Sequence, residues 1–255
     1  MSNTTVIIQA RMGSTRLPGK VLLNIVGKPM LYRLIERVKN SKNTDQIVIA
    51  TTDSPLDDAI EKFALSNKIN CYRGSENDVL DRFYHAAKEF DADPIVRITG
   101  DCPLMDSEIL DKVIQAYFDN DVDYESNTQP PTYPDGLDVE VFSFAALEKM
   151  WNEAEKQSER EHVTPYIYNN PSIFKMDNVV SDEDLSDVRL TVDEKEDLQV
   201  VSEVFKALYA KNKNFSLRDI LKFMVQNPEL FQSNAKFQRN EGYMKSILED
   251  DEKTL

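Results

Sequence analysis

The chain has 255 residues, of which 41% are hydrophobic, and a formal net charge of −15 at pH 7. This apolar content excludes a disordered chain, and the acidic excess argues against a protein that binds nucleic-acid backbones or anionic membranes. The two cysteines are too few for a disulfide framework, and no window approaches the ~18 consecutive apolar residues of a membrane-spanning helix.

The first part of the chain alternates short apolar strands with amphipathic helices. The first strand follows the N-terminus without a signal-peptide pattern, which favours a cytoplasmic location. Apolar runs predict strands over residues 6–8, 46–50, 69–72 and 94–98. Apolar residues at helical spacing predict helices over residues 30–38, 55–64 and 79–87. This alternation is typical of an α/β fold with a doubly wound, mostly parallel sheet.

The pattern is less regular after Asp101. Apolar spacing predicts helices through residues 109–114, 198–208 and 214–225, and strands at residues 137–144 and 189–193. The first of these strands should be half-exposed, because apolar and acidic positions alternate along it. Prolines favour a turn or an extended arm at residues 129–136, and the last ~20 residues are typical of a frayed acidic tail. We therefore predict a single domain over residues 1–230, with an inserted arm at about 128–170 and a C-terminal extension over 231–255.

A loop rich in glycine and basic residues follows the first strand, from Ala10 to Lys20. In open α/β sheets, ligands bind beyond the carboxyl ends of the strands. Gly13 and Gly19 allow a ligand to approach the backbone closely, and backbone amides in such a turn can hold phosphate oxygens while Arg11 neutralises them. The loop matches neither the P-loop nor the dinucleotide-binding glycine motif. Its residues alone support a phosphate-binding loop and a solvated basic turn equally well.

Two acidic residues follow other predicted strands. Asp101 comes shortly after the strand at residues 94–98, and Asp193 comes about ninety residues later, at the end of another strand. Each alone is more typical of a turn or a helix cap. Together with the basic loop they favour a site for Mg²⁺, which prefers one or two carboxylates, phosphate oxygens and water.

The run from Ile8 to Lys20, continued by residues 27–29, resembles the signature of the cytidylyltransferases that activate acidic sugars, the CMP-Kdo and acylneuraminate synthetases. The resemblance covers about residues 5–210 and is strongest to the spore coat polysaccharide biosynthesis branch. Further matching stretches are residues 73–82, 99–104, 133–144, 158–166 and 191–198. The resemblance implies a Rossmann-like nucleotidyltransferase fold with an inserted dimerisation arm, and a homodimer.

The resemblance also implies a role for each matched residue. Arg11 and Lys20 would contact the triphosphate, Asp101 and Asp193 would hold Mg²⁺, and these four residues would be catalytic. The residues implied to bind CTP and its metal are Gln9, Ala10, Arg11, Met12, Gly13, Ser14, Lys20, Ser75, Asp78, Arg82, Thr99 and Asp101. Those implied to bind the acceptor, in part across a dimer interface, are Asp135, Asp138, Glu140, Arg160, Glu161, His162 and Thr164.

Two positions depart from the sialic-acid and Kdo enzymes, which usually have proline in place of Gln9 and an acidic or polar residue in place of Cys102. The spore-coat-like branch shares both differences, so the resemblance predicts the nucleotide but not the acceptor. From the residues alone, His162 stays open between an acid–base role and a helix-capping or packing role.

The sequence therefore predicts a Mg²⁺-dependent enzyme that transfers CMP from CTP to a sugar-like or phosphorylated small acceptor and releases pyrophosphate, in surface polysaccharide or glycoconjugate biosynthesis. An acceptor oxygen would attack the α-phosphorus in line, without a covalent enzyme intermediate. Two alternatives remain: a glycosyltransferase that uses a nucleotide-sugar, and a non-catalytic nucleotide-binding partner in the same pathway.

Overall fold

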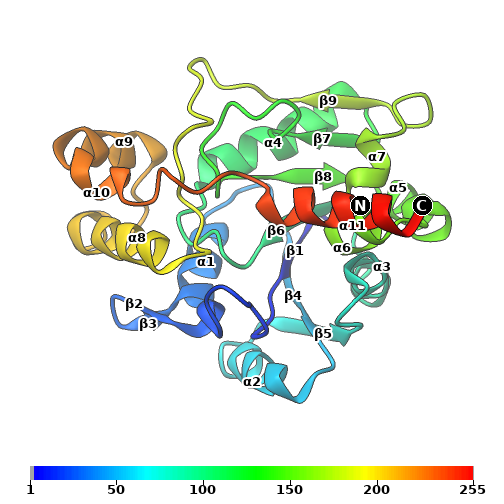
Figure 1. The fold of residues 1–255 in the computed structure, drawn as a ribbon, viewed down its shortest axis with the longest axis horizontal. Coiled ribbons are helices and arrows are strands. Elements are labelled where there is room, and N and C mark those ends of the chain that lie inside the picture. The colour runs from blue at the N-terminus through cyan, green and yellow to red at the C-terminus, as the bar shows by residue number, and fades with distance from the viewer. Residues whose placement is uncertain (1–2, 255) are drawn as a thin grey trace.

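The computed structural model describes residues 3–254, which fold around a seven-stranded sheet with the order β5-β4-β1-β6-β8-β7-β9 (Figure 1). Within it, β8 is antiparallel to both of its neighbours, and the other pairings are parallel. The strands are β1 (Thr5–Gln9), β4 (Gln46–Thr52), β5 (Asn70–Gly74), β6 (Ile95–Thr99), β7 (Tyr124–Ser126), β8 (Glu140–Phe142) and β9 (Met176–Asn178). A small hairpin, β2 (Asn24–Ile25) with β3 (Lys28–Pro29), lies outside this sheet. The predicted mostly parallel α/β sheet is confirmed.

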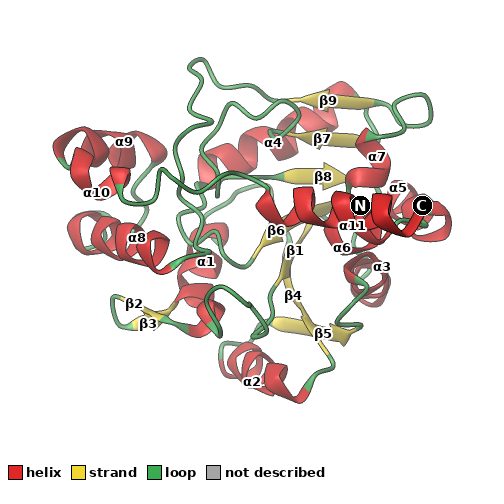
Figure 2. Ribbon diagram, viewed as in Figure 1, coloured by secondary structure: helices red, strands yellow, loops and turns green. Residues whose placement is uncertain are grey.

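Helices cover both faces of the sheet (Figure 2). One side carries α1 (Met30–Val38), α2 (Asp58–Ser66), α4 (Ser107–Asn120) and α8 (Lys195–Leu208), and the other carries α3 (Val79–Glu89), α5 (Phe144–Glu153), α6 (Gln157–His162) and α7 (Pro165–Tyr168). The chain continues through α9 (Leu217–Gln226), α10 (Pro228–Gln232) and α11 (Glu241–Thr254), and short 3-10 turns occupy η1 (Lys20–Leu22) and η2 (Pro55–Asp57). No helix within residues 3–254 is both long and apolar enough to cross a membrane.

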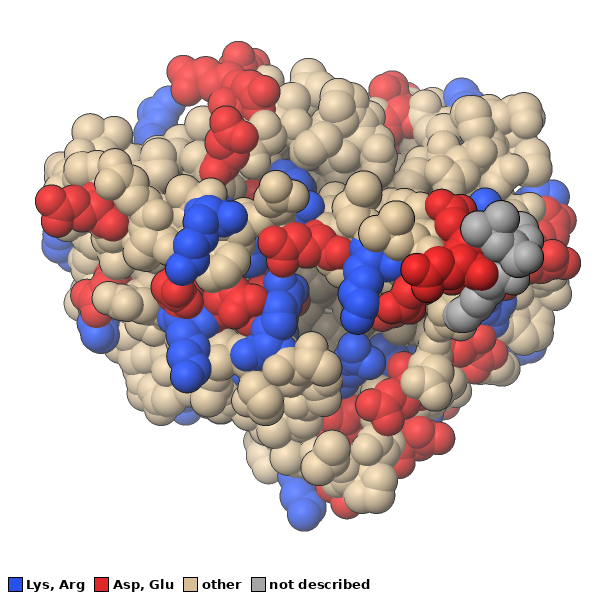
Figure 3. All heavy atoms as spheres, viewed as in Figure 1, with Lys and Arg blue, Asp and Glu red and all other residues tan. Residues whose placement is uncertain are grey.

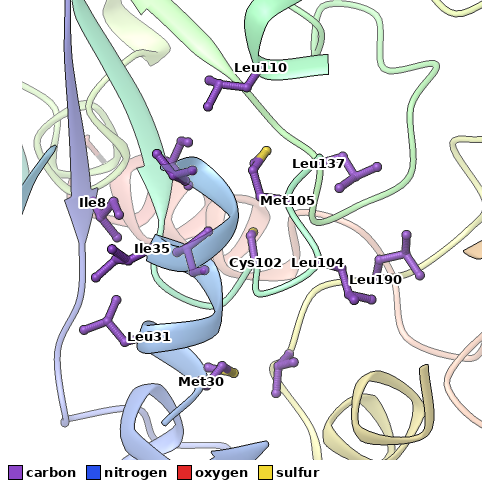
Figure 4. Packing of buried hydrophobic residues seen from close by; sticks show 14 of the residues in the cluster. Ile8, Met30, Leu31, Ile35, Cys102, Leu104, Met105, Leu110, Leu137 and Leu190 are labelled. Carbon is purple, nitrogen blue, oxygen red and sulfur yellow. The ribbon is translucent and has the colours of Figure 1, made fainter. Parts of the chain in front are cut away.

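The hydrophobic core follows from the alternation of side chains along the strands. In β1, Ile8 faces the cluster beneath α1, whereas Ile7 faces the cluster beneath α3, because successive residues of a strand point to opposite faces. Figure 4 shows Leu31 and Ile35 of α1 facing Ile8, with Cys102 in the same cluster. Both faces of the central strands are therefore buried, as in other doubly wound sheets.

The cysteines take part in packing. Cys102 is buried in the cluster of Figure 4, and burial raises the pKa of its thiol well above the ordinary value. Cys71 on β5 is half-buried and also free. Neither forms a disulfide within the part of the chain that the structure describes.

The predicted half-exposed strand at residues 137–144 is wrong in two respects. Only β8 forms within it, and the acidic position Glu140 is as buried as its apolar neighbours, with 5% of its surface exposed. The alternation misled because the Glu140 carboxylate lies against polar partners inside the protein. It accepts hydrogen bonds from the hydroxyls of Tyr124 and Thr164, both at 2.6 Å.

The strand predicted at residues 189–193 is also wrong. This segment makes a single bridge to Asp135 and otherwise runs as irregular chain. Its apolar residues are buried because they close the core between two loops, and the Val192 amide donates to the Asp101 carbonyl at 2.9 Å. Gly136 is required at this contact, since a Cβ there would lie 2.5 Å from the Thr191 nitrogen.

The C-terminal residues form the helix α11 rather than the predicted frayed tail. Figure 1 shows α11 lying across α6, and the two helices are in contact. The Asp250 carboxylate accepts hydrogen bonds from the backbone amides of Gln157 at 3.1 Å and Ser158 at 3.0 Å. Amides in the first turn of a helix such as α6 have no acceptor within the helix itself. By accepting from them, Asp250 stabilises the N-terminal end of α6.

Most of the predicted arm at residues 128–170 packs within this chain. Leu147 and Met150 of α5, Val163 after α6 and Ile167 of α7 are fully buried in the cluster beneath α3. A contact between two subunits through this segment stays a prediction.

Candidate active site

The candidate site lies at the carboxyl ends of β1 and β6. These neighbours end side by side, with Gln9 opposite Thr99, and the chain leaves them toward opposite edges of the sheet, to β4 after β1 and to β7 after β6. Gly100 brings the two following loops together: its amide donates to the Gln9 carbonyl at 2.8 Å, and a Cβ would lie 2.8 Å from that oxygen. This point of reversal is where doubly wound sheets bind their ligands.

Lys20 joins the loops that follow β1 and β6 to the segment before α8. Its Nζ donates to Asp101 Oδ2 at 2.8 Å, Asp193 Oδ1 at 2.7 Å and the Val192 carbonyl at 2.9 Å. Only 8% of the residue is exposed. Burial acts to lower the pKa of this ammonium, but Asp101 and Asp193 raise it overall. The fold thus unites the three charged residues that the sequence placed in separate loops.

The two carboxylates can both reach one cation, because Lys20 Nζ contacts both. Burial acts to raise the pKa of Asp101, but Lys20 lowers it to about 2, so this carboxylate is ionised at neutral pH. Within residues 3–254, no cluster of three or more acidic, histidine or cysteine side chains could hold a metal. A divalent cation at Asp101 and Asp193 would therefore need further oxygen ligands from a bound molecule or water.

The loop between Ala10 and Lys20 is held in shape by its own backbone and by Asp57. The Gly19 amide donates to the Met12 carbonyl at 3.0 Å, and the Met12 amide donates to Asp57 Oδ1 at 2.7 Å. Asp57 was missed by sequence reasoning, and its only signal was an acidic residue in the turn after β4.

Of the backbone amides of Met12, Gly13 and Ser14, two are available to a ligand and one is not. Because the Met12 amide already has an acceptor in Asp57, the predicted phosphate contact from this amide is not supported by the geometry. The amides of Gly13 and Ser14 donate to no group among the described residues. Arg11 is exposed and makes no ion pair within residues 3–254.

Arg82 and Ser75 lie beside this loop. Arg82 is 2% exposed, its Nη1 donates to the Ser75 carbonyl, and its Nε has no acceptor within residues 3–254. Burial, and then the positive charge of Arg11, lower the pKa of Arg82 to about 10. An anion next to these two guanidinium groups would therefore be stabilised.

Asp78 and Arg160, predicted on opposite sides of the site, bind each other. Arg160 Nε and Nη2 donate to Asp78 Oδ2 at 2.9 and 2.6 Å, and Arg160 Nη1 donates to the Trp151 carbonyl. Asp78 also caps α3 through the Asp81 amide at 2.9 Å. This pair ties α6 to α3, and Arg160 does not line the cavity described next.

A cavity of about 250 Å³ opens from the strand ends toward β8. Figure 3 shows charged side chains of both signs around a hollow near the middle of this face. The predicted residues that line the cavity are Gln9, Thr99, Asp101, Asp135, Asp138, Glu140, His162, Thr164 and Asp193. Its lining also includes residues that sequence reasoning did not select: Arg97, Arg189, Tyr168, Arg239 and Tyr243.

Two arginines of this cavity are heavily paired. Arg97 donates to Glu140 through Nη1 and to Gln9 Oε1 through Nε at 3.2 Å. Arg189 contacts three carboxylates, those of Asp135 at 2.8 Å, Asp197 at 2.9 Å and Asp193 at 3.1 Å. Burial acts to lower the pKa of Arg189, but these neighbours raise it. Both side chains hold the walls of the cavity in place.

Asp135 and Asp138 are two aspartates of the cavity wall whose pKa values are raised. Burial raises the pKa of Asp135 to about 6 against the lowering effect of Arg239 and Arg189. Burial likewise raises the pKa of Asp138 to about 7, although Arg239 pairs with it. Both carboxylates line the cavity and can accept hydrogen bonds from hydroxyl groups.

Glu161 and His162 anchor the C-terminal helix. Ser246 Oγ of α11 donates to Glu161 Oε2 at 3.0 Å and lies 3.1 Å from His162 Nε2. Burial lowers the pKa of His162 to about 4, so the imidazole is neutral at physiological pH. This geometry favours the packing role over the acid–base role that the residues alone left open.

Comparison with known proteins shows which family the sequence matches. The model of the cytidylyltransferase family matches residues 5–246. The uncharacterised protein MJ1063 of Methanocaldococcus jannaschii is 44% identical over 90% of this chain and 93% of its own length. The spore coat polysaccharide biosynthesis protein SpsF of Bacillus subtilis is 36% identical over 90% and 97%. A cytidylyltransferase structure from Leptospira borgpetersenii superposes with a TM-score of 0.87 at 36% identity, covering 94% of this chain and 100% of that one.

Proposed function

Because this chain belongs to the cytidylyltransferase family, we propose that it transfers CMP from CTP to a sugar-like or phosphorylated small acceptor and releases pyrophosphate. The observation that carries the proposal is the convergence of Lys20 on Asp101 and Asp193, at 2.8 and 2.7 Å, beside a loop with free backbone amides. The name of the SpsF relative supports a place in surface polysaccharide or glycoconjugate synthesis.

The loop from Ala10 to Lys20 binds the triphosphate. The free amides of Gly13 and Ser14 donate to its oxygens, and Arg11 and Lys20 neutralise its charge. Arg82 is buried beside this loop, its Nε lacks an acceptor within residues 3–254, and its guanidinium adds positive potential at the phosphate site. Ser75 and Asp78 act by shaping this side, because their side chains accept hydrogen bonds from the chain itself.

The cytosine base lies near the ends of β1 and β6. Gln9, Ala10 and Thr99 are placed there by the pairing of the two strands. Ala10 is buried, which leaves the Gln9 side chain and the Thr99 hydroxyl as the groups that can recognise the polar edge of a base.

Asp101 and Asp193 fit a divalent cation, since their carboxylates already converge on one positive charge and the triphosphate supplies the remaining oxygens. Bound Mg²⁺ would offset charge on the phosphates. Lys20 keeps Asp101 ionised and holds both carboxylates in position for this purpose. Arg189 holds Asp193 from the other side at 3.1 Å.

The acceptor occupies the cavity between the strand ends and β8. Asp135 and Asp138 accept hydrogen bonds from its hydroxyl groups, while Glu140 and Thr164 hold each other and act as wall residues. An acceptor oxygen forms a bond to the α-phosphorus as the bond to pyrophosphate breaks. Catalysis comes from positioning and charge neutralisation. We also propose that the enzyme acts as a homodimer through the segment at residues 128–170.

The Asp57→Ala variant should lose about tenfold in kcat/KM for CTP, since the loop loses the contact that fixes Met12 and a small displacement of bound phosphates slows transfer. It should also be less stable by about 1–3 kcal/mol, because the buried amide of Thr52 and the partly buried amide of Met12 lose their acceptor. Steady-state kinetics and thermal unfolding check both effects, with Asp53→Ala at an exposed position as the control. Wild-type kinetics in Asp57→Ala would show that this carboxylate does not fix the position of the loop from Ala10 to Lys20.

The proposed function is tested by incubating the chain with each of the four nucleoside triphosphates, Mg²⁺ and a panel of acceptors, and by measuring pyrophosphate. The panel contains 3-deoxy-manno-octulosonate, N-acetylneuraminate and hexose 1-phosphates. We expect release with CTP that depends on one class of acceptor. Transfer from a nucleotide-sugar without pyrophosphate would favour a glycosyltransferase. CTP binding without turnover on any acceptor would favour a non-catalytic partner.

A further inference from the structure

One wall of the acceptor cavity comes from the C-terminal segment, whose role the sequence left open. Six consecutive residues, Gln238–Tyr243, line the cavity, and we name them the C-terminal strap. Figure 1 shows the chain crossing in front of the sheet between α10 and α11, and the strap is the end of this crossing together with the first turn of α11. The strap therefore faces the strand ends from the side opposite the sheet.

The strap is held by contacts of two of its residues and of α11 beyond it. Arg239 contacts Asp138 through Nη2 and the Tyr133 carbonyl through Nη1 at 3.0 Å. Glu241 accepts a hydrogen bond from Arg16 of the phosphate-binding loop at 3.1 Å. After the strap, Ser246 binds Glu161 and so fixes α11 on α6. These contacts join both sides of the site to one C-terminal segment.

Arg239 differs from Arg189 and Arg97 in the carboxylates that it contacts. Arg189 contacts three carboxylates, and the Glu140 carboxylate that Arg97 contacts also accepts hydrogen bonds from two hydroxyls. Arg239 contacts Asp138, whose carboxylate accepts a hydrogen bond from no other group among residues 3–254, and makes its other hydrogen bond to a neutral carbonyl. Its guanidinium therefore keeps donors for a ligand at the cavity wall, where 14% of its side chain is exposed.

We propose that Arg239 is a specificity-determining residue that donates hydrogen bonds to an oxygen of the acceptor, while its partner Asp138 accepts one from an acceptor hydroxyl. This inference rests on the proposed function. It assigns the C-terminal strap to recognition of the acceptor and leaves CTP binding to the loop from Ala10 to Lys20. An acceptor with adjacent hydroxyl and anionic or carbonyl oxygens suits such a guanidinium–carboxylate pair.

The test compares Arg239→Gln, Arg239→Lys and the control Arg218→Gln, an exposed arginine on α9 away from the cavity. The probe is the panel compound that gives the fastest pyrophosphate release with CTP and the wild-type chain. We expect the KM for this acceptor to rise at least tenfold in Arg239→Gln, with the KM for CTP and the melting temperature nearly unchanged. Arg239→Lys should recover part of the loss, and Arg218→Gln should behave as wild type.

The pH dependence adds a readout that a purely structural role would not change. The charged groups that face Asp138 are Arg239 on the strap, Asp135 and Glu140 on its own segment, and Arg97 on β6. Asp138 has a pKa of about 7, so acceptor kcat/KM should rise with pH through this region. Removing Arg239 raises the pKa of Asp138 further, because it removes a charge that lowers it. The rise should therefore shift to higher pH in Arg239→Gln.

The possible results separate the two proposals. An unchanged acceptor KM and pH profile in Arg239→Gln, with active wild type, would overturn the role of Arg239 and leave the proposed function standing. An equal rise in the KM for CTP and the KM for the acceptor would also overturn the role of Arg239. No turnover by the wild-type chain with any panel compound would overturn the proposed function and this inference with it.

Discussion

The Lys20→Ala variant is expected to release pyrophosphate at least about 100-fold more slowly than the wild-type chain, because it lacks the cation that meets the triphosphate and holds both carboxylates. With alanine, the Asp101 and Asp193 carboxylates lie close together without the positive charge that offsets their mutual repulsion. Burial would then raise the pKa of Asp101 without opposition from Lys20. The variant should therefore bind CTP more weakly as well as turn it over slowly.

The measurement for Lys20→Ala is initial-rate release of pyrophosphate at saturating CTP and Mg²⁺. Circular dichroism shows whether the sheet and helices are retained, and Lys195→Ala, at an exposed position on α8, is the matched control. Near-normal turnover in a folded Lys20→Ala chain would remove Lys20 from the catalytic machinery.

The Asp101→Asn variant should lose turnover by about 100-fold or more and need a higher Mg²⁺ concentration for half-maximal rate, because asparagine keeps the shape but removes one of two converging charges. Asp193→Asn should show the same direction. A magnesium titration of the rate measures both effects, with Asp182→Asn, at an exposed position, as the control. An unchanged magnesium requirement would contradict the metal-binding role of these carboxylates.

The lowered pKa of Asp101 predicts that the stability of the folded chain depends on pH. The pKa of Asp101 is about 2 in the folded chain and has an ordinary value of 3.8. Because the folded value is lower, the carboxylate contributes stability above the ordinary pKa, and this contribution is lost as the pH falls toward 2. Asp101→Asn should remove this contribution, so its melting temperature should fall less than that of the wild type between pH 5 and about 3.

The elements that the sequence predicted well are those whose signal is local. Strands such as β1 and β4 are short apolar runs, and the α1 and α3 helices show their spacing directly. The convergence of Lys20 with Asp101 could also be anticipated, since both follow parallel strands whose carboxyl ends share one edge of a sheet. Each of these predictions depended on a local pattern or on the general geometry of parallel sheets.

The parts that sequence reasoning missed depend on contacts between distant segments. Glu140 looks like an exposed acidic position until Thr164 and Arg97 surround it. The acidic end of the chain looks like a frayed tail, yet Asp250 caps a helix more than ninety residues earlier. Arg239 lies at the cavity through contacts with Asp138 and the Tyr133 carbonyl, both more than a hundred residues earlier. Local pattern carries no signal for such pairs.

The central claim is that one site, formed by the loop from Ala10 to Lys20 with Asp101 and Asp193, binds the metal and the triphosphate. A crystal structure of the chain with CTP and Mg²⁺, without acceptor, tests it most directly. We expect phosphate oxygens against the Gly13 and Ser14 amides and Arg11, with the metal on Asp101 and Asp193. A nucleotide whose phosphates lie instead among Asp135, Asp138 and the C-terminal strap would contradict the account.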